Sequence, residues 1–296
     1  MNYKKSTGEK VFSAFNLFFL CLFGLICVYP IVYILAVSFS GSLAVMEGRV
    51  WLYPVDFHLK AYEIVFSNDN ILRAYLNTLL YTVIGTGFNL AAITCAAYPL
   101  SKKRLRGRSG FSLYFVFTIL FGGGMVPNFL LIQKLGFYDT IWAVTVPGAV
   151  SVFYMIILRT NFEQIPDALE EAAIIDGMND LQILFRIFIP LSLPIYAALI
   201  LFFAVGHWNS FFDAFIYLQT KSRYPLQVIL KEIVTANTLN DLGNSAVGQS
   251  AMETTELVGE NLKCATIIVV MLPVMMVYPF VQKYFVKGMM VGSVKG

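Results

Sequence analysis

"EEAAIIDGMNDLQILFRIFIP" (residues 170–190) interrupts a chain that is otherwise strongly apolar. Just before it, Pro166 suits the first turn of a helix, where acids such as Asp167 and Glu170 are favoured by the partial positive charge of the helix end. Gly177 weakens a helix interior and predicts a break, after which a second helix begins at about Asp180. The segment therefore predicts a short acidic helix, a turn and a further helix.

The composition of the whole chain is that of a membrane protein. Of its 296 residues, 58% are hydrophobic and 13% are charged, whereas about a quarter of the residues in a soluble domain are charged. The net charge of +3 is too small to indicate a surface that binds nucleic acid. The four cysteines lie in apolar runs without a CxxC pair, which predicts neither a disulfide framework nor a metal site.

Six windows are apolar enough to cross a bilayer, for which a helix needs about 20 residues. We therefore predict an all-α integral membrane protein with six transmembrane helices in one domain, residues 1–296. The predicted spans cover residues 11–37, 75–98, 111–131, 141–158, 195–218 and 264–286.

The distribution of lysine and arginine predicts the orientation, because these residues accumulate in cytoplasmic loops. The loop "SKKRLRGRSG" (residues 101–110) holds five cations, whereas the next loop holds only Lys134. Both termini are therefore predicted to be cytoplasmic, as is the loop 159–194 that contains the acidic segment. A short helix in this loop could dock into a cleft on another protein or lie on the lipid surface. Its acidic residues favour docking to a protein, because the negatively charged inner leaflet would repel them.

Seven positions of the acidic segment match a known signature at fixed spacing. Glu171-Ala172-Ala173, Gly177, Ile187, Ile189 and Pro190 resemble the EAA-x3-G-x9-I-x-L-P signature of ABC importer permeases, with Ile189 in place of leucine. The stretches "AYPLSKKRLRGR" (97–108), "GHWNSFFDAFIYL" (206–218) and "YPFVQKYFVKGMMVGSVKG" (278–296) are similar to those of carbohydrate importers. The last of these stretches resembles the terminus of a maltose-type (MalG-like) permease. The stretches "FGGGMVP" (121–127) and "LYPVDFHLKAYEIVF" (52–66) resemble the branch that imports oligosaccharides and polysaccharide fragments.

This resemblance implies an ABC type I importer permease fold and a set of partners in a bacterial cytoplasmic (inner) membrane. A second, non-identical permease would complete the translocation path, an ATPase dimer would use ATP and Mg, and an extracytoplasmic sugar-binding protein would deliver the oligosaccharide. The chain itself would be no enzyme and would bind no cofactor, which agrees with the absence of a GxxxxGK[ST] phosphate loop.

The resemblance also implies roles for particular residues. Coupling to the ATPase is assigned to the helix and turn, at Glu171, Ala172, Ala173, Gly177 and Met178. A tail that contacts the ATPase is assigned to Lys287, Gly288, Gly292 and Lys295.

The fifth predicted span carries polar residues. An ionisable side chain in a span is a functional hypothesis by default, which makes His207 and Asp213 candidates for the substrate path. The polar Asn209 and the aromatic Trp208 beside them are included as candidates. The same residues also fit an aromatic girdle at the membrane interface, where tryptophan and tyrosine are common. In the third span, the glycines at 122–124 predict either an unwound stretch beside the path or a helix end.

The alternative function is a self-contained secondary transporter or channel. That interpretation leaves the acidic segment unexplained, and no internal repeat is evident. An intramembrane enzyme is a third possibility, but the chain has two distant histidines and no HExxH motif.

Overall fold

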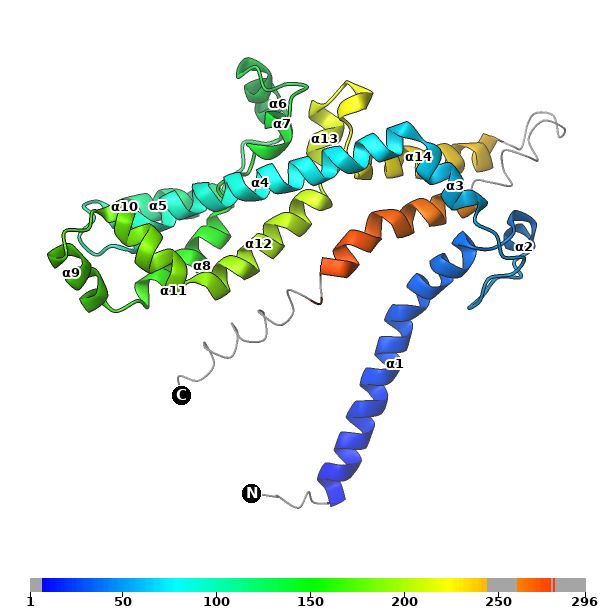
Figure 1. Ribbon diagram of the computed structural model, residues 1–296, viewed down its shortest axis with the longest axis horizontal. Helices are drawn as coiled ribbons and strands as arrows, with labels where there is room; N and C mark the ends of the chain where they lie inside the picture. The colour runs from blue at the N-terminus through cyan, green and yellow to red at the C-terminus, as the bar shows by residue number, and fades with distance from the viewer. Residues whose placement is uncertain (1–6, 244–259, 278, 280–296) are drawn as a thin grey trace. The chain divides into compact units, whose positions relative to one another are not determined.

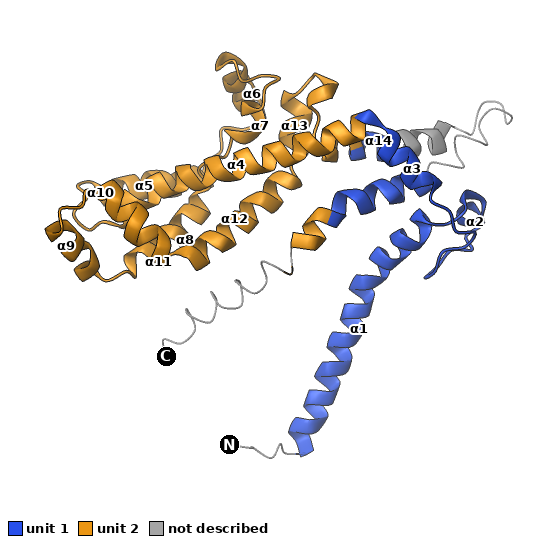
Figure 2. Ribbon diagram, in the orientation of Figure 1, with its two compact units in different colours: residues 1–69, 230–272 blue, residues 70–229, 273–296 orange. Residues whose placement is uncertain are grey.

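The computed structural model describes residues 7–243, 260–277 and 279, and every regular element in these ranges is a helix (Figure 1). The chain divides into two compact units (Figure 2). The first comprises residues 1–69 and 230–272, and the second comprises residues 70–229 and 273–296. Each unit has its own core.

The helices of the first unit are α1 (Thr7–Ser38), α2 (Ser42–Met46) and α3 (Lys60–Ser67). A further helix, Glu260–Val277, lies mostly in this unit. The core gathers the end of α1, at Ala36 and Val37, against Ala44, Val50 and Cys264. Most of α1 instead exposes phenylalanine and leucine side chains, which suits a helix surrounded by lipid.

The helices of the second unit begin with α4 (Asp69–Ser101), whose first residue belongs to the first unit. They continue with α5 (Arg108–Leu120), α6 (Met125–Lys134), α7 (Trp142–Thr145), α8 (Val152–Glu163), α9 (Asp167–Ile175), α10 (Asp180–Ile183), a π-helical turn (Leu184–Phe188), α11 (Ile189–Leu191), α12 (Leu193–Trp208) and α13 (Phe212–Tyr217). A 3-10 turn (Lys221–Arg223) leads to α14 (Leu226–Gly243), which extends beyond this unit.

Three of the described helices are long and apolar enough to cross a membrane: α1, α4 and Glu260–Val277. The number rises to five if each of two bent pairs forms one span. These pairs are α5 with α6, bent by 115°, and Asp180–Leu191 with α12, bent by 84°. The predicted all-helical membrane fold is thus confirmed, whereas the count of six spans and the cytoplasmic termini stay predictions.

Two predicted spans contain breaks with local causes. In the third, α5 ends at Leu120, and Gly124 has a φ of +83° that favours glycine before α6 begins. The window 141–158 is not one continuous helix, because Pro147, which lacks an N–H donor, falls between α7 and α8.

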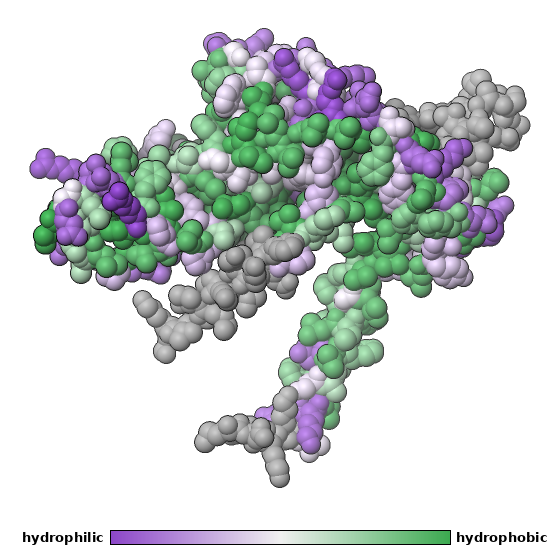
Figure 3. Space-filling view, in the orientation of Figure 1, coloured by the Kyte–Doolittle hydropathy of each residue, from purple (hydrophilic) through white to green (hydrophobic). Residues whose placement is uncertain are grey.

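Among the described residues, the largest core lies in the second unit and connects the acidic segment with the long helices. It joins α4, α8, the π-helical turn and α12, and includes Ile93, Ala97, Leu158, Phe162, Ile183, Phe188 and Leu199. On the face shown in Figure 3, hydrophilic residues gather around α9 and again around α6 and α13, with mainly hydrophobic residues between them. This distribution suits a body that crosses a membrane.

Asp139 joins two connecting segments of the second unit. Its Oδ1 accepts hydrogen bonds from the backbone N–H groups of Gln219 (3.0 Å) and Thr220 (3.1 Å), and its Oδ2 accepts one from the Thr220 hydroxyl (2.6 Å). Arg223 Nη1 lies 2.9 Å from Oδ2. Partial desolvation raises the pKa of the Asp139 carboxyl, but these hydrogen bonds and the Arg223 charge outweigh it and hold the pKa below its ordinary value.

Asp139→Asn is expected to lower stability by about 1–2 kcal/mol, because the amide loses the charged contacts. Asparagine tolerates the left-handed backbone at this position (φ +52°), so backbone strain does not confound the change. Since the folded-state pKa is depressed, the advantage of the wild type is complete above the unfolded pKa of about 3.9 and shrinks as the pH falls below it. Thermal unfolding in detergent at pH 7 and pH 3.5 measures both effects, and an equal difference at the two pH values would contradict the assignment.

Candidate functional site

The acidic segment forms a helix–turn–helix whose turn depends on Gly177. The N–H of Gly177 donates to the carbonyl of Ile174 (3.0 Å), and the N–H of Met178 donates to the carbonyl of Ala173 (2.9 Å). This pair of bonds is a Schellman motif, in which the residue after the C-cap adopts a left-handed conformation. Gly177 has a φ of +79°, so the matched glycine is explained by the backbone of the turn.

The next helix begins with a capping box. The side-chain oxygen of Asn179 accepts from the N–H of Gln182 (2.9 Å), and the side chain of Gln182 accepts from the N–H of Asn179 (2.9 Å). The turn is therefore defined on both sides by local hydrogen bonds. The break at Gly177 and the restart at Asp180 are confirmed.

The two faces of α9 differ in burial. Ala173 is buried in the core, and Met178 packs partly buried against the same core. Glu171 and Ala172 are exposed, and Ile175 is 85% exposed. Of the five predicted coupling residues, two thus lie on the inner side, two face outward, and Gly177 forms the turn.

Glu170, next to the matched signature, anchors α9 to the end of α4. Its Oε2 accepts a hydrogen bond from Lys102 Nζ at 2.6 Å, and its Oε1 lies 3.3 Å from Arg104. The Lys102 side chain is only 9% exposed, and its ammonium also lies over the rings of Phe188 (3.6 Å) and Tyr98 (4.4 Å). Desolvation lowers the pKa of Lys102, and the hydrogen bond to Glu170 acts against that shift.

The ion pairs continue along the acidic segment. Arg104 also pairs with Asp180 (2.5 Å), and Lys103 pairs with Asp167 (3.1 Å) at the surface. A cavity of about 490 Å³ opens beside these groups. From the sequence alone, the cations of residues 102–108 indicate mainly the orientation in the membrane. The acidic residues of the segment 167–180 are the sequence signal for the ion pairs that some of these cations form.

The predicted path residues have different surroundings. The His207 ring packs against the backbone of α4, where a Cβ on Gly85 would lie 2.5 Å from it, and Asn89 Nδ2 lies 3.2 Å from its Nε2. Trp208 is buried and meets Tyr75 edge-on, with 5.7 Å between the ring centroids. These two side chains join α12 to α4.

Asn209 and Asp213 lie at the break between α12 and α13. Asn209 is exposed, donates to the carbonyl of Val205 (3.0 Å) and accepts from Gln227 (3.3 Å). Asp213 is half-buried in the first turn of α13. The predicted ATPase-contacting tail at Lys287, Gly288, Gly292 and Lys295 lies outside the described residues.

Comparison with known proteins assigns the family. The chain is 42% identical over 280 residues to the polygalacturonan/rhamnogalacturonan transport system permease protein YtcP of Bacillus subtilis (strain 168), covering 94% of this chain and 96% of the relative. It belongs to the permease subunits of sugar ABC transporters. The permease is also 39% identical to Protein LplC of the same organism, covering 97% and 96% of the two chains. No family model matches it.

A solved structure of a related transporter supports the same family assignment. The permease superposes with a TM-score of 0.86 on a chain of a bacterial ABC transporter involved in the import of the acidic polysaccharide alginate. That chain is 37% identical, and the match covers 95% of the permease and 99% of the solved chain. The permease is therefore an integral membrane protein with the fold of this transporter family.

Gly177→Ala is expected to destabilise the permease by about 1–2 kcal/mol, because a Cβ is strained in the left-handed conformation. Open space surrounds the position, so strain and not a clash causes the loss. Gly177→Asn should cost less, since asparagine also ends helices in this way. The matched control is Gly110→Ala in α5, which also meets open space and should be neutral or stabilising. Unfolding midpoints in detergent rank the three variants, and equal losses at both positions would refute the explanation.

The buried ion pair makes a second prediction. Glu170→Gln or Lys102→Met alone should each cost about 3 kcal/mol, because each leaves a charge without its full complement. The double variant should recover part of the loss, which a double-mutant cycle of unfolding free energies measures. The same cycle on the exposed pair Lys103 and Asp167 should give less than about 1 kcal/mol. Strict additivity at Lys102 and Glu170 would show that they do not interact.

Proposed function

We propose that the permease receives movement from an ATPase through the outer face of α9. The observation that supports this is the division of α9 into an anchored and an exposed face. Ala173 and Glu170 fix the helix to the core and to α4. Ala172 is small enough for another backbone to approach closely, and Ile175 offers apolar surface to a partner.

The proposed assembly follows the family. A second, non-identical permease completes the translocation path, and an ATPase dimer beneath the membrane binds ATP and Mg. An extracytoplasmic binding protein delivers the sugar, and the complex resides in the bacterial cytoplasmic membrane. Membership among ABC transporter permeases supports this arrangement, because the relatives are named as parts of transport systems.

The proposed substrate is an oligosaccharide from an acidic polysaccharide. The relative YtcP is named for polygalacturonan and rhamnogalacturonan, and the solved transporter for alginate. Polygalacturonan and alginate consist of uronic acids, so their fragments carry carboxylates. Within this chain, Asn209, Asp213, His207 and Trp208 remain candidates for the path, and the contacts of His207 and Trp208 with α4 give these two a packing role as well.

Glu171→Lys tests the coupling assignment. Reversing this exposed charge should leave the permease inserted and folded but weaken ATPase binding at least about tenfold, which corresponds to about 1.4 kcal/mol. Co-purification of the ATPase from detergent-solubilised membranes measures binding, and uptake of labelled oligosaccharide measures transport. Glu63→Lys makes the same charge change on an exposed residue of α3 and serves as the control. Retention of both ATPase binding and uptake in Glu171→Lys would show that α9 is not the docking element.

The same purification addresses the alternative of a self-contained transporter or channel. An importer permease should carry a second permease and an ATPase through the purification, whereas a self-contained transporter should be isolated alone or as a homo-oligomer.

A further inference from the structure

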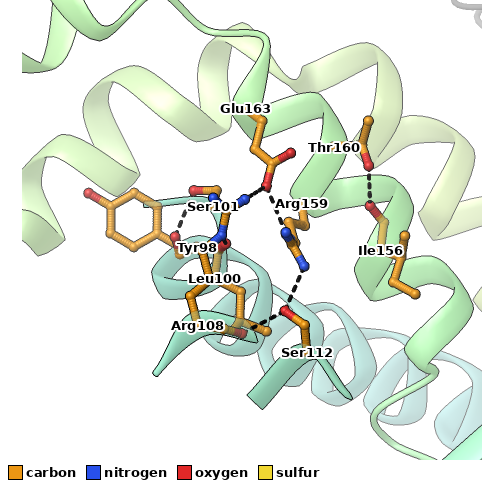
Figure 4. A network of polar contacts seen from close by, with 9 residues as sticks. All are labelled: Tyr98, Leu100, Ser101, Arg108, Ser112, Ile156, Arg159, Thr160 and Glu163. Carbon is orange, nitrogen blue, oxygen red and sulfur yellow. Dashed lines mark hydrogen bonds and ion pairs between the residues drawn. The ribbon is translucent and has the colours of Figure 1, made fainter. Parts of the chain in front are cut away.

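Two arginines share a single carboxylate where α5 begins and α8 ends (Figure 4). Arg159 Nε donates to Glu163 Oε1 at 2.8 Å, and Arg108 Nη2 donates to the same oxygen. Arg108 also donates from Nε to the carbonyl of Leu100 (2.8 Å), and Arg159 donates from Nη1 to the hydroxyl oxygen of Ser112 (2.8 Å). Two guanidinium groups around one carboxylate leave a local charge of +1.

An open groove of about 470 Å³ adjoins these arginines. It is lined by Arg108, Ser109, Ser112, Leu113, Val116 and Arg159. The α5 residues have the spacing of one helix face. The groove is polar at the start of α5 and apolar one to two turns further on, at Leu113 and Val116. The described residues bury no side chain of α5, so this part of the chain leaves the groove face of α5 accessible.

We propose that this groove binds one anionic phospholipid, with the phosphate at Arg108 and Arg159 and an acyl chain along Leu113 and Val116. A phosphodiester supplies the single negative charge that the arrangement lacks. Guanidinium groups present paired N–H donors that match phosphate oxygens. Each arginine has an Nη atom outside the hydrogen bonds described above, and Ser109 adds an exposed hydroxyl at the polar end.

The apolar half of the groove selects a lipid over a soluble anion. A free phosphate would satisfy the arginines but would leave Leu113 and Val116 without a partner. A lipid fills both halves of the groove. Its headgroup can lie at the polar end while the attached acyl chain extends along the apolar end. Neither arginine belongs to the signature matched in α9 and its turn, so this proposal stands independently of the proposed coupling.

The test uses the intact transporter in nanodiscs of phosphatidylcholine with increasing phosphatidylglycerol, and native mass spectrometry counts the bound phosphatidylglycerol. Arg108→Gln and Arg159→Gln should each reduce occupancy at least about fivefold at a fixed lipid fraction. Glu163→Gln should increase it, because loss of the carboxylate raises the local charge from +1 to +2. Arg106→Gln removes an exposed cation of the same loop outside the groove and should leave occupancy unchanged.

Val116→Trp tests the groove without altering the ion pairs. The tryptophan side chain should fill the apolar half of the groove and reduce lipid occupancy. This variant keeps the proposal testable if an arginine variant fails to fold. The proposal is overturned if Arg106→Gln reduces binding as much as Arg108→Gln, since attraction would then be unspecific. It is also overturned if millimolar inorganic phosphate displaces the lipid as effectively as added phosphatidylglycerol, or if the intact transporter excludes lipid here because another subunit covers the groove.

Discussion

The position of α9 depends on the ion pair between the Glu170 carboxylate and Lys102. The carboxylate lies against the nearly buried ammonium of Lys102, which an apolar environment would otherwise destabilise. The rings of Phe188 and Tyr98 lie on the same ammonium and add cation–π attraction. A buried pair of this kind contributes little net stability but strongly disfavours any arrangement that separates its members. It therefore fixes where α9 sits relative to the end of α4. Under the proposed coupling, a force on α9 would pass through this ion pair to α4.

The anchored face of α9 also explains why the described residues leave its outer face exposed. Ala173 has no polar side-chain group to satisfy and is buried in the same core as Phe162 and Phe188. The turn at Gly177 then returns the chain to the core within two residues, because Met178 both closes the Schellman motif and packs inward. The side chains on the outer face, such as Glu171, Ala172 and Ile175, are small, apolar or charged, and they do not belong to the core. A partner that bound this surface would leave the contacts of Glu170 and Ala173 in place.

Local rules predicted the parts of the structure that depend on neighbouring residues. Pro166, Gly177 and Asp180 marked the beginning, break and restart of the acidic segment, because caps and turns are decided within a few residues. Long apolar windows likewise predicted α1 and α4. Hydropathy could not show that the window 141–158 divides into two helices, because a window average does not register the N–H that Pro147 lacks.

The contacts that the sequence could not predict mainly join residues that lie far apart in the chain. Lys102 and Glu170 are 68 residues apart, and both were recognised only as charges on the same predicted side. His207 packs against Gly85, which lies more than 100 residues earlier and provides the space for its ring. The sequence could not show this packing, and the assignment of His207 to the substrate path stays a prediction.

The cation-rich loop at 101–110 illustrates how one sequence feature serves several purposes. Its first three cations, Lys102, Lys103 and Arg104, pair with acids of α9 and α10, whereas Arg108 turns to Glu163 at the end of α8. The two carboxylates, Glu170 and Glu163, thus divide the loop between the proposed docking helix and the surface of α5 and α8. The cations that face α9 and α10 each have an acidic partner, whereas Arg108 and Arg159 share one carboxylate and leave one positive charge at the surface of α5 and α8. A loop that merely signalled orientation would need neither arrangement, so the positions of these acids assign the cations to distinct structural roles.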